Sequence, residues 1–135
     1  MPLAFDYVEN SPILIMNADG HFTIQDAREM FIRSAEFKKE IGGHLYRISD
    51  FSRAESTFTE VLGILRLASN SDLPGSSADP DVTVILVGDN KWAKMAAELL
   101  KQPQFHSLNI PIFDTQSEAI QYARLHHSLY YKDGN

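Results

Sequence analysis

The sequence contains no cysteine, and this absence excludes disulfides, thiolate metal sites and cysteine nucleophiles. It also has no apolar run that approaches the ~18 residues expected of a membrane-spanning helix. The N-terminus shows no cationic stretch followed by an apolar core, so we expect no secretory signal peptide. Together these absences predict a cytoplasmic protein without a transmembrane segment.

Positive charge is also scarce. Lys and Arg number 12 against 18 Asp and Glu, which leaves a formal net charge of −6 at pH 7. Nucleic-acid binders carry a basic surface, so we expect no nucleic-acid partner. Apolar residues make up 44% of the 135 positions and charged residues 22%, close to the averages of globular proteins. This length and composition predict a single folded domain over residues 1–135.

Apolar patterning divides the chain into alternating strands and helices. Strands are expected at residues 5–9, 13–16, 44–49, 82–87 and 110–113. The turn sequence Asn10-Ser11-Pro12 lies between the first two and predicts an antiparallel hairpin. The apolar run 82–87 is typical of a central strand that is covered on both faces.

Four helices are expected after the hairpin. Thr57 with Glu60, and Thr115 with Glu118, have the spacing of capping boxes and predict helices near residues 57–69 and 115–127. Thr23 starts an earlier helix in a similar way, and the chain from residue 129 onward is expected to fray. The remaining helix has apolar residues at helical spacing, namely Trp92, Met95, Ala96, Leu99 and Leu100. This face predicts that Trp92 is mostly buried against the sheet.

The order of these elements predicts an α/β fold. Its sheet is expected to be mixed and five-stranded, with the first strand antiparallel on an edge and the others parallel, and with four main helices. Residues 70–81 form the only linker-like stretch. Twelve residues are many for a loop inside a domain, so we expect this segment to be either mobile or functional.

Polar residues follow several of the predicted strands. Because α/β folds place ligand sites at the carboxyl ends of their strands, these residues, together with Trp92, form a candidate rim for a ligand or a partner. The members of this rim are Asp50, Ser52, Asp89, Trp92 and Asp114, and Asp19 is expected beside them. A simpler interpretation is that aspartate is favoured in turns and at helix starts, where it accepts backbone hydrogen bonds.

The sequence offers little support for catalysis. Its five histidines lack the i, i+4 spacing of a helical zinc site, so we expect no metal. There is no phosphate-binding loop and no serine nucleophile elbow, so we expect no cofactor and no enzymatic activity. A hydrolase that uses the aspartate rim is the most distant alternative.

Hydroxyl groups gather between the third strand and the helix that follows it. Thr57 is expected to be the N-cap of that helix, and Ser56 precedes it directly. Ser56 and Thr57 are also candidate phosphoacceptors, because a phosphate at a helix N-terminus meets backbone N–H groups and the favourable end of the helix dipole.

Short motifs in both halves of the chain point to a family. Val87-Gly88-Asp89 with Trp92, the strand end Phe113-Asp114-Thr115, and the helix opening Glu118-Ala119-Ile120 resemble the SpoIIAA-like (STAS/Sec14-like) proteins. The entry to the first helix, Gly20 to Asp26, resembles them as well. The resemblance covers nearly the whole chain in element order. It implies a (βα) superhelix with no established enzymatic activity.

The resemblance also implies functions. In the STAS branch, the anti-sigma-factor antagonists carry a phosphorylated serine at the position of Ser56, although Glu55 and Phe58 replace the Asp and Gly of that motif. This implies a regulatory module with a protein partner, and a second copy of the chain is an admissible partner. The Sec14-like comparison implies an alternative, a carrier of a small apolar ligand or lipid in a cleft that Trp92 lines.

Overall fold

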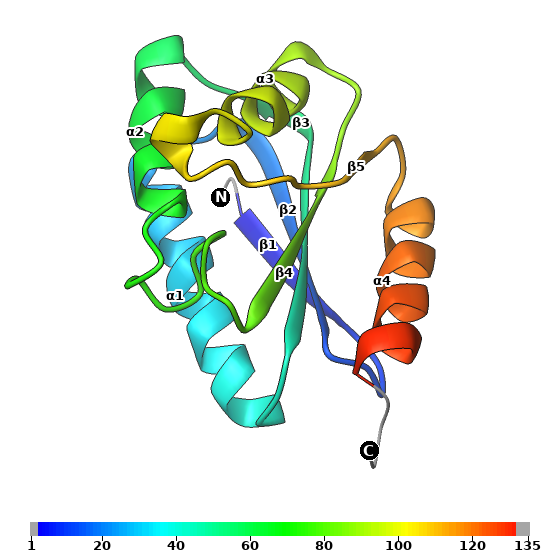
Figure 1. Ribbon diagram of the computed structural model, residues 1–135. Helices are drawn as coiled ribbons and strands as arrows, with labels where there is room; N and C mark the ends of the chain where they lie inside the picture. The colour runs from blue at the N-terminus through cyan, green and yellow to red at the C-terminus, as the bar shows by residue number, and fades with distance from the viewer. Residues whose placement is uncertain (1–2, 132–135) are drawn as a thin grey trace.

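The strands and helices alternate along the chain as the sequence predicts. A computed structural model describes residues 3–131 (Figure 1). Its strands are β1 (Leu3–Val8), β2 (Ile13–His21), β3 (Leu45–Glu55), β4 (Val82–Val87) and β5 (Ile112–Phe113). Its helices are α1 (Ile24–Ile41), α2 (Phe58–Ala68), α3 (Lys91–Leu100) and α4 (Gln116–Tyr130), with a short 3-10 turn, η1 (Pro103–Phe105). Within residues 3–131, no helix combines the length and hydrophobicity needed to cross a bilayer.

All five strands form one sheet in the order β1-β2-β3-β4-β5. β1 pairs antiparallel with β2 at one edge, and every other neighbouring pair is parallel. The predicted α/β class, the mixed sheet and the hairpin are therefore confirmed. β4 lies between two strands, with both of its faces largely buried, as its apolar sequence predicts.

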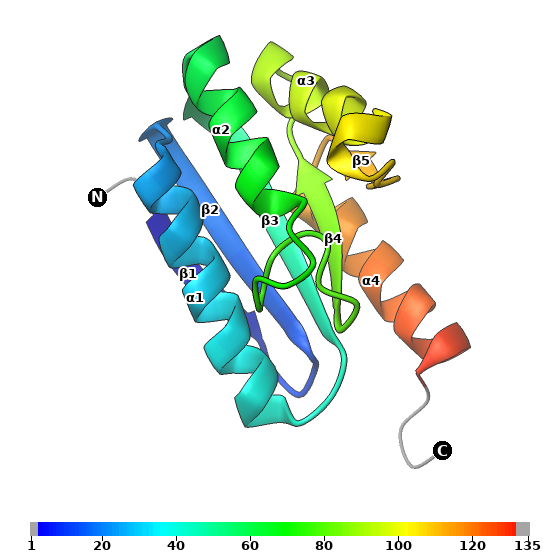
Figure 2. The same cartoon turned by 60° about the vertical axis from the view of Figure 1, so that its left-hand side comes forward.

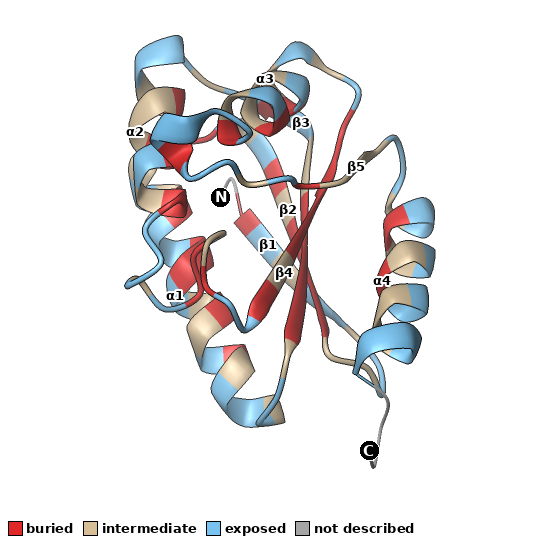
Figure 3. Ribbon diagram, viewed as in Figure 1, coloured by how far each residue is buried: buried red, intermediate tan, exposed pale blue. Residues whose placement is uncertain are grey.

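Helices cover the two faces of the sheet unequally. Helices α1, α2 and α3 lie on one face, and α4 lies alone on the other (Figures 1 and 2). Alternate residues of the strands point to opposite faces of the sheet. Leu14 and Val84 pack toward the three helices, whereas Ile48 and Ile85 pack toward α4. Figure 3 shows the resulting burial along β3 and β4. The core therefore has two layers with the sheet between them.

Threonines begin three of the helices, as their spacing predicts. Thr23 and Thr115 form complete capping boxes, in which the third helical residue also bonds back to the cap. Thr57 caps α2 with its hydroxyl, but the Glu60 carboxylate does not return to the Thr57 N–H. Instead Glu60 Oε1 lies 2.6 Å from His21 Nε2. This link joins the start of α2 to the end of β2.

Strands β2 and β3 continue further than predicted. β2 runs to His21 rather than ending near Met16, and β3 runs to Glu55 rather than ending at Ser49. The two strands keep pairing in parallel as far as His21 and Glu55, across an irregularity between Asn17 and Asp19. Pairing between the two strands therefore keeps residues 17–21 and 50–55 in strand conformation, although several of their side chains are polar and typical of turns.

The buried face of α3 is rotated from the predicted one. Ala93, Ala97 and Leu100 are its fully buried residues, and Trp92 is partly buried and packs against the core beside them. The small alanines let the helix approach the sheet, and the larger side chains flank the contact. At the other end of the chain, α4 extends to Tyr130, so the predicted fraying from residue 129 is wrong for Leu129 and Tyr130. The rest of that prediction, residues 132–135, lies outside the described residues.

The segment 70–81 is folded against the helical layer (Figure 2). Gly75 has a φ of +82° and lies so close to α1 that an added Cβ would stand 2.2 Å from the Phe31 carbonyl oxygen. The Asp79 carboxylate accepts hydrogen bonds from the Gly75 N–H at 2.7 Å and from Lys38 Nζ at 2.8 Å. The Ala78 N–H donates to the Ala68 carbonyl. These contacts place the segment directly over the interior of the protein.

Candidate functional site

The structure separates the members of the predicted rim. Asp50 and Ser52 lie on β3 and line a surface pocket of about 430 Å³, which Asp19, Asn17 and Gln116 also line. Asp89 and Asp114 are exposed and do not line that pocket, and Trp92 lines a different cavity. The rim residues therefore do not all line one pocket. Asp50 and Ser52 line the polar pocket, Trp92 lines the apolar cavity, and Asp89 and Asp114 line neither.

Side chains inside the polar pocket are bonded to one another. The Gln116 amide nitrogen donates to Asn17 Oδ1 at 2.6 Å and to Asp50 Oδ2 at 2.7 Å. The other oxygen of Asp50 accepts from the Ser52 N–H at 2.9 Å and from its hydroxyl at 2.5 Å. Asp50 therefore joins the start of α4 to the sheet, and its carboxylate accepts the Ser52 hydroxyl proton together with two other hydrogen bonds. No group of three His, Asp or Glu side chains within residues 3–131 is placed to hold a metal ion.

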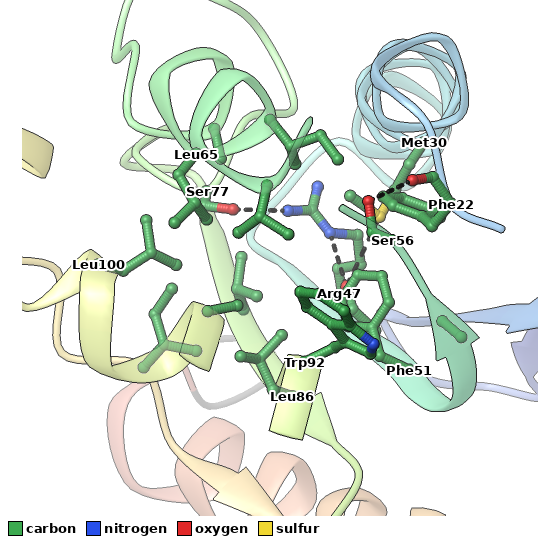
Figure 4. A pocket seen from close by; sticks show the side chains of 18 of the residues that line it. Phe22, Met30, Arg47, Phe51, Ser56, Leu65, Ser77, Leu86, Trp92 and Leu100 are labelled. Carbon is green, nitrogen blue, oxygen red and sulfur yellow. Dashed lines mark hydrogen bonds between the residues drawn. The ribbon is translucent and has the colours of Figure 1, made fainter. Parts of the chain in front are cut away.

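An apolar cavity of about 70 Å³ lies between the sheet and helices α1, α2 and α3. Figure 4 shows side chains from β3, β4 and these helices converging on it. Most of its wall is apolar, and the larger side chains include Phe22, Met30, Phe51, Leu65, Leu86 and Trp92. Trp92 thus lines an interior space of this fold.

Arg47 is the one charged residue of this wall that is fully buried, with an exposure of 0%. Its guanidinium donates to the hydroxyl oxygens of Ser34 at 3.0 Å, Ser49 at 3.3 Å and Ser77 at 3.1 Å, and to the Gly75 carbonyl. It also lies over the Phe31 ring, 5.2 Å from the centroid. Burial lowers the pKa of Arg47 to about 9, so the guanidinium remains charged at neutral pH.

Sequence reasoning did not single out Arg47. The residue stands in a strand of alternating character, where an arginine is usually expected to point to solvent. Its acceptors come from α1, from β3 itself and from the segment 70–81, and no local pattern relates these three parts of the chain. The one available signal is the group Gly75-Ser76-Ser77 in that segment, whose small and polar residues suit a close approach to a buried donor.

The two candidate phosphoacceptors lie at the start of α2 and have different surroundings. Ser56 is half-buried, lines the apolar cavity and donates its hydroxyl to the Phe22 carbonyl at 2.9 Å. Thr57 is exposed, and its hydroxyl oxygen accepts from the Glu60 N–H at 3.2 Å. The adjacent Phe58 is 54% exposed. The start of α2 therefore carries two hydroxyl groups and an exposed phenyl ring close to one side of the cavity.

Large apolar side chains are also exposed on α4. Leu125, Leu129 and Tyr130, here called the α4 patch, are 59%, 63% and 68% exposed. Leu125 and Leu129 are four residues apart and share one side of the helix. Leu125 and Leu129 are therefore neighbouring exposed leucines on one side of α4, and the exposed Tyr130 follows Leu129 directly in the helix.

An aromatic cluster holds α4 on the sheet beneath this patch. The Tyr46 hydroxyl lies 2.7 Å from His126 Nδ1, and the His44 ring stacks on Tyr131 with centroids 4.2 Å apart. Burial raises the pKa of the Tyr46 phenol and lowers the pKa of the His44 imidazole. Both shifts favour the neutral forms at pH 7. The α4 patch is therefore presented on a helix that is bonded to the centre of the sheet.

Solved structures of two other proteins share this architecture. The anti-sigma factor antagonist SpoIIAA in its unphosphorylated form superposes with a TM-score of 0.59 at 14% identity, over 90% of this chain and 97% of that one. An uncharacterised protein of the DUF3478 family with a SpoIIAA-like fold, from Shewanella loihica PV-4, gives a TM-score of 0.57 at 12% identity, over 90% and 91%. No protein-family model matches the chain, and no curated protein matches it either. The likeness confirms a SpoIIAA-like fold.

Proposed function

We propose that this chain, whose fold is that of the SpoIIAA-like proteins, is a non-catalytic regulatory module that binds a partner protein. The observation that carries the proposal is the α4 patch, whose side chains are more than half exposed on a helix held firmly on the sheet. Neighbouring exposed apolar residues mark surfaces that another molecule covers. Similarity to a structure described as an anti-sigma factor antagonist supports a protein as that molecule.

The partner that fits this surface is a protein with complementary apolar side chains. Fully burying a leucine stabilises a complex by about 1.5–3 kcal/mol, so Leu125 and Leu129 are suited to a central role in binding. Tyr130 adds an aromatic ring with a polar end, a type of residue that is enriched at interfaces. Self-association through the same patch would produce a homodimer, which the experiment below distinguishes.

We place the regulatory step at the start of α2. A phosphate on Ser56 would replace the hydroxyl that now donates to the Phe22 carbonyl, and a phosphate on Thr57 would alter the cap of α2. Either change adds negative charge next to exposed Phe58 and near the N–H groups of the first helical turn. Phosphorylation would thus change a surface at the start of α2 that is separate from the α4 patch, on the other face of the sheet.

A second candidate function is the binding of a small apolar ligand. The cavity beside Trp92 supports it, because its wall is largely apolar. Its volume of about 70 Å³ is well below the ~300 Å³ typical of sites for drug-sized molecules. Any ligand of this cavity must therefore be much smaller than a lipid.

The test of the interaction proposal compares two equally exposed apolar positions. A double variant, Leu125→Ser with Leu129→Ser, removes the leucines of the α4 patch, and Ile32→Ser on α1 is the control, because Ile32 is 58% exposed. Proteins captured by each form from the native cell are identified, and the affinity of the purified partner is then measured. We expect the double variant to bind at least about tenfold more weakly than wild type and Ile32→Ser.

The oligomeric state is measured alongside by light scattering. A wild-type dimer that the double variant converts to a monomer would assign the patch to self-association. Equal affinity of the partner for all three forms would refute the use of the α4 patch.

A further inference from the structure

The last turns of α4 are held on the sheet by rings rather than by aliphatic side chains. Ala119 and Ala123 are the buried residues of this helix. Beyond them, the rings of His126 and His127 lie across the ring of Tyr46, with centroids 5.5 and 5.8 Å away. Tyr46 is 0% exposed on β3. Docking of this end of α4 therefore depends on two side chains that can take up a proton.

A third histidine contacts the same phenol from the start of β3. The His44 ring is nearly perpendicular to the Tyr46 ring, with centroids 5.4 Å apart, and it stacks on Tyr131. Its Nε2 lies 2.6 Å from Thr83 Oγ1. Three imidazoles thus surround one buried ring, and a proton taken up by one of them disfavours a proton on the next.

The hydrogen bond between β3 and α4 fits a neutral imidazole. Burial raises the pKa of the Tyr46 phenol, so the phenol keeps its proton. With this phenol as the donor, His126 Nδ1 accepts at 2.7 Å and must carry a lone pair. Protonation of His126 removes that lone pair. The buried Tyr46 hydroxyl would then lose the acceptor that it now has, which costs free energy in the docked state.

Negative charge near His44 does not outweigh its burial. Burial lowers the pKa of His44, whereas the carboxylates of Asp81 and Asp79 act in the opposite direction. Both carboxylates contact Lys38 Nζ, at 3.5 and 2.8 Å, so part of their charge is already neutralised. Docked His44 therefore takes up a proton less readily than an exposed imidazole.

The groups that face the histidines from α4 add positive charge or none. His126 and His127 lower the pKa of His44 further. Arg124 lines a surface pocket together with His44 and His127. The other rings that contact His126 are phenols, namely Tyr122, Tyr130 and Tyr131. Acid would thus gather positive charge where α4 meets the sheet.

We propose that the end of α4 is an acid-sensitive contact, in which protonation of the histidines around Tyr46 releases residues 124–130, and the α4 patch with them, from the sheet. Because docked His44 binds a proton less tightly than exposed His44, linkage requires acid to favour the released form. Docking is complete above about pH 6.5, the ordinary pKa of an imidazole, and weakens as the pH falls below it. The consequence for binding rests on the proposed function: affinity for a partner on the α4 patch falls in acid.

The test measures amide hydrogen exchange of residues 124–130 at pH 7.5 and pH 5.5, corrected for the intrinsic effect of pH on exchange. This measurement needs no partner. We expect protection in wild type to fall at least about tenfold at pH 5.5, the factor that corresponds to one pKa unit in one histidine.

Variants that cannot be protonated locate the effect. His44→Gln keeps an amide group for Thr83, and His126→Asn offers an amide oxygen to the Tyr46 hydroxyl in place of Nδ1. In the double variant, we expect protection to differ by less than about twofold between the two pH values. His106→Asn is the control, because His106 is exposed after η1 with a φ of +66°, which asparagine tolerates, and it should respond as wild type does.

Circular dichroism and the melting temperature at pH 7.5 establish that each variant is folded. If the double variant does not fold, each single variant should still show a smaller response to pH than wild type. Equal responses of wild type and the single variants would then overturn the inference.

The outcomes separate this inference from the proposed function. Equal protection of wild type at the two pH values would overturn the acid-sensitive contact and leave the α4 patch as a binding surface. A response that persists in the folded double variant would assign it to other groups and would also overturn the inference. Release of residues 124–130 in acid with unchanged partner affinity would support the acid-sensitive contact and refute binding through the α4 patch.

Discussion

Lys38 Nζ lies 2.8 Å from Asp79 Oδ2, and this ion pair joins α1 to a segment without helix or strand of its own. The Asp79 side chain is only 5% exposed. Burial by itself raises the pKa of that carboxyl, but hydrogen bonds from Lys38 and from the Gly75 and Asp81 N–H groups outweigh burial, and the pKa is lowered. Asp79 is therefore a bonded anion that holds the segment 70–81 in place.

The first prediction follows from this lowered pKa. The stabilisation by Asp79 is complete above the unfolded value of about 3.9 and is lost as the pH falls through the lower folded value. Asp79→Asn should cost about 2–3 kcal/mol of unfolding free energy at pH 7 and should weaken the loss of stability below about pH 4. Urea unfolding across this pH range measures both effects. Asp72→Asn, an exposed position in the same segment, is the control and should leave the profile unchanged.

The second prediction concerns the close approach of Gly75 to α1. In Gly75→Ala, the new Cβ would stand 2.2 Å from the Phe31 carbonyl oxygen and the residue would keep a φ of +82°, so the segment must move. We expect a cost of about 3 kcal/mol or more. Gly43→Ala is the matched control, because its Cβ would meet nothing within 4 Å, and it should change stability by less than about 0.5 kcal/mol. Equal costs for the two variants would contradict the tight docking of the segment.

The third prediction compares two large apolar residues of α3. Leu100 is 3% exposed in the core, whereas Trp92 is half-buried beside the cavity. Leu100→Ala should cost about 3 kcal/mol, and Trp92→Ala should cost less, about 2 kcal/mol, because its ring packs against existing empty space on one side. Thermal unfolding of both variants measures the difference. A larger loss for Trp92→Ala would mean that Trp92 carries more of the core than its exposure indicates.

The fourth prediction distinguishes the cap from the switch at the start of α2. Thr57→Ala should cost about 1 kcal/mol and leave partner affinity intact. Ser56→Asp places a carboxylate against the Phe22 carbonyl, so it should destabilise the fold by about 1–2 kcal/mol and change partner affinity. Affinities are compared at matched folded fractions. Equal affinity of wild type and Ser56→Asp, together with no phosphate found by mass spectrometry after kinase treatment, would refute the proposed switch.

Much of the fold could be predicted because its signals are local. The spacing of Thr115 and Glu118 marks the start of α4, and the apolar run Val82–Val87 coincides with β4. The face of α3 was harder to predict, since Trp92 and Leu100 both fit a helical period. The buried face of α3 includes Ala93 and Ala97, because their small side chains allow the helix to approach the sheet.

The candidate sites depend on contacts that local patterns do not encode. Asp50 and Asp89 were both expected at strand ends, but Asp50 lies inside β3, which continues to Glu55, and lines the polar pocket, whereas Asp89 does not line it. The burial of Arg47 depends on a segment almost thirty residues away that folds back to cover it. A site formed by contacts between distant parts of the chain can be identified only from the three-dimensional structure.

The order of the strands in the sheet has a consequence for how the protein is made. Each strand after β1 pairs with the one that precedes it in the chain, so none of β2 to β5 must wait for a later strand in order to find a neighbour. During synthesis from the N-terminus, the β1–β2 hairpin can form first, and β3, β4 and β5 can each add to the growing edge as they leave the ribosome. β5 supplies only two residues to that edge. A final strand this short offers little backbone to a second nascent chain, so growth of the sheet at the β5 edge ends within the molecule.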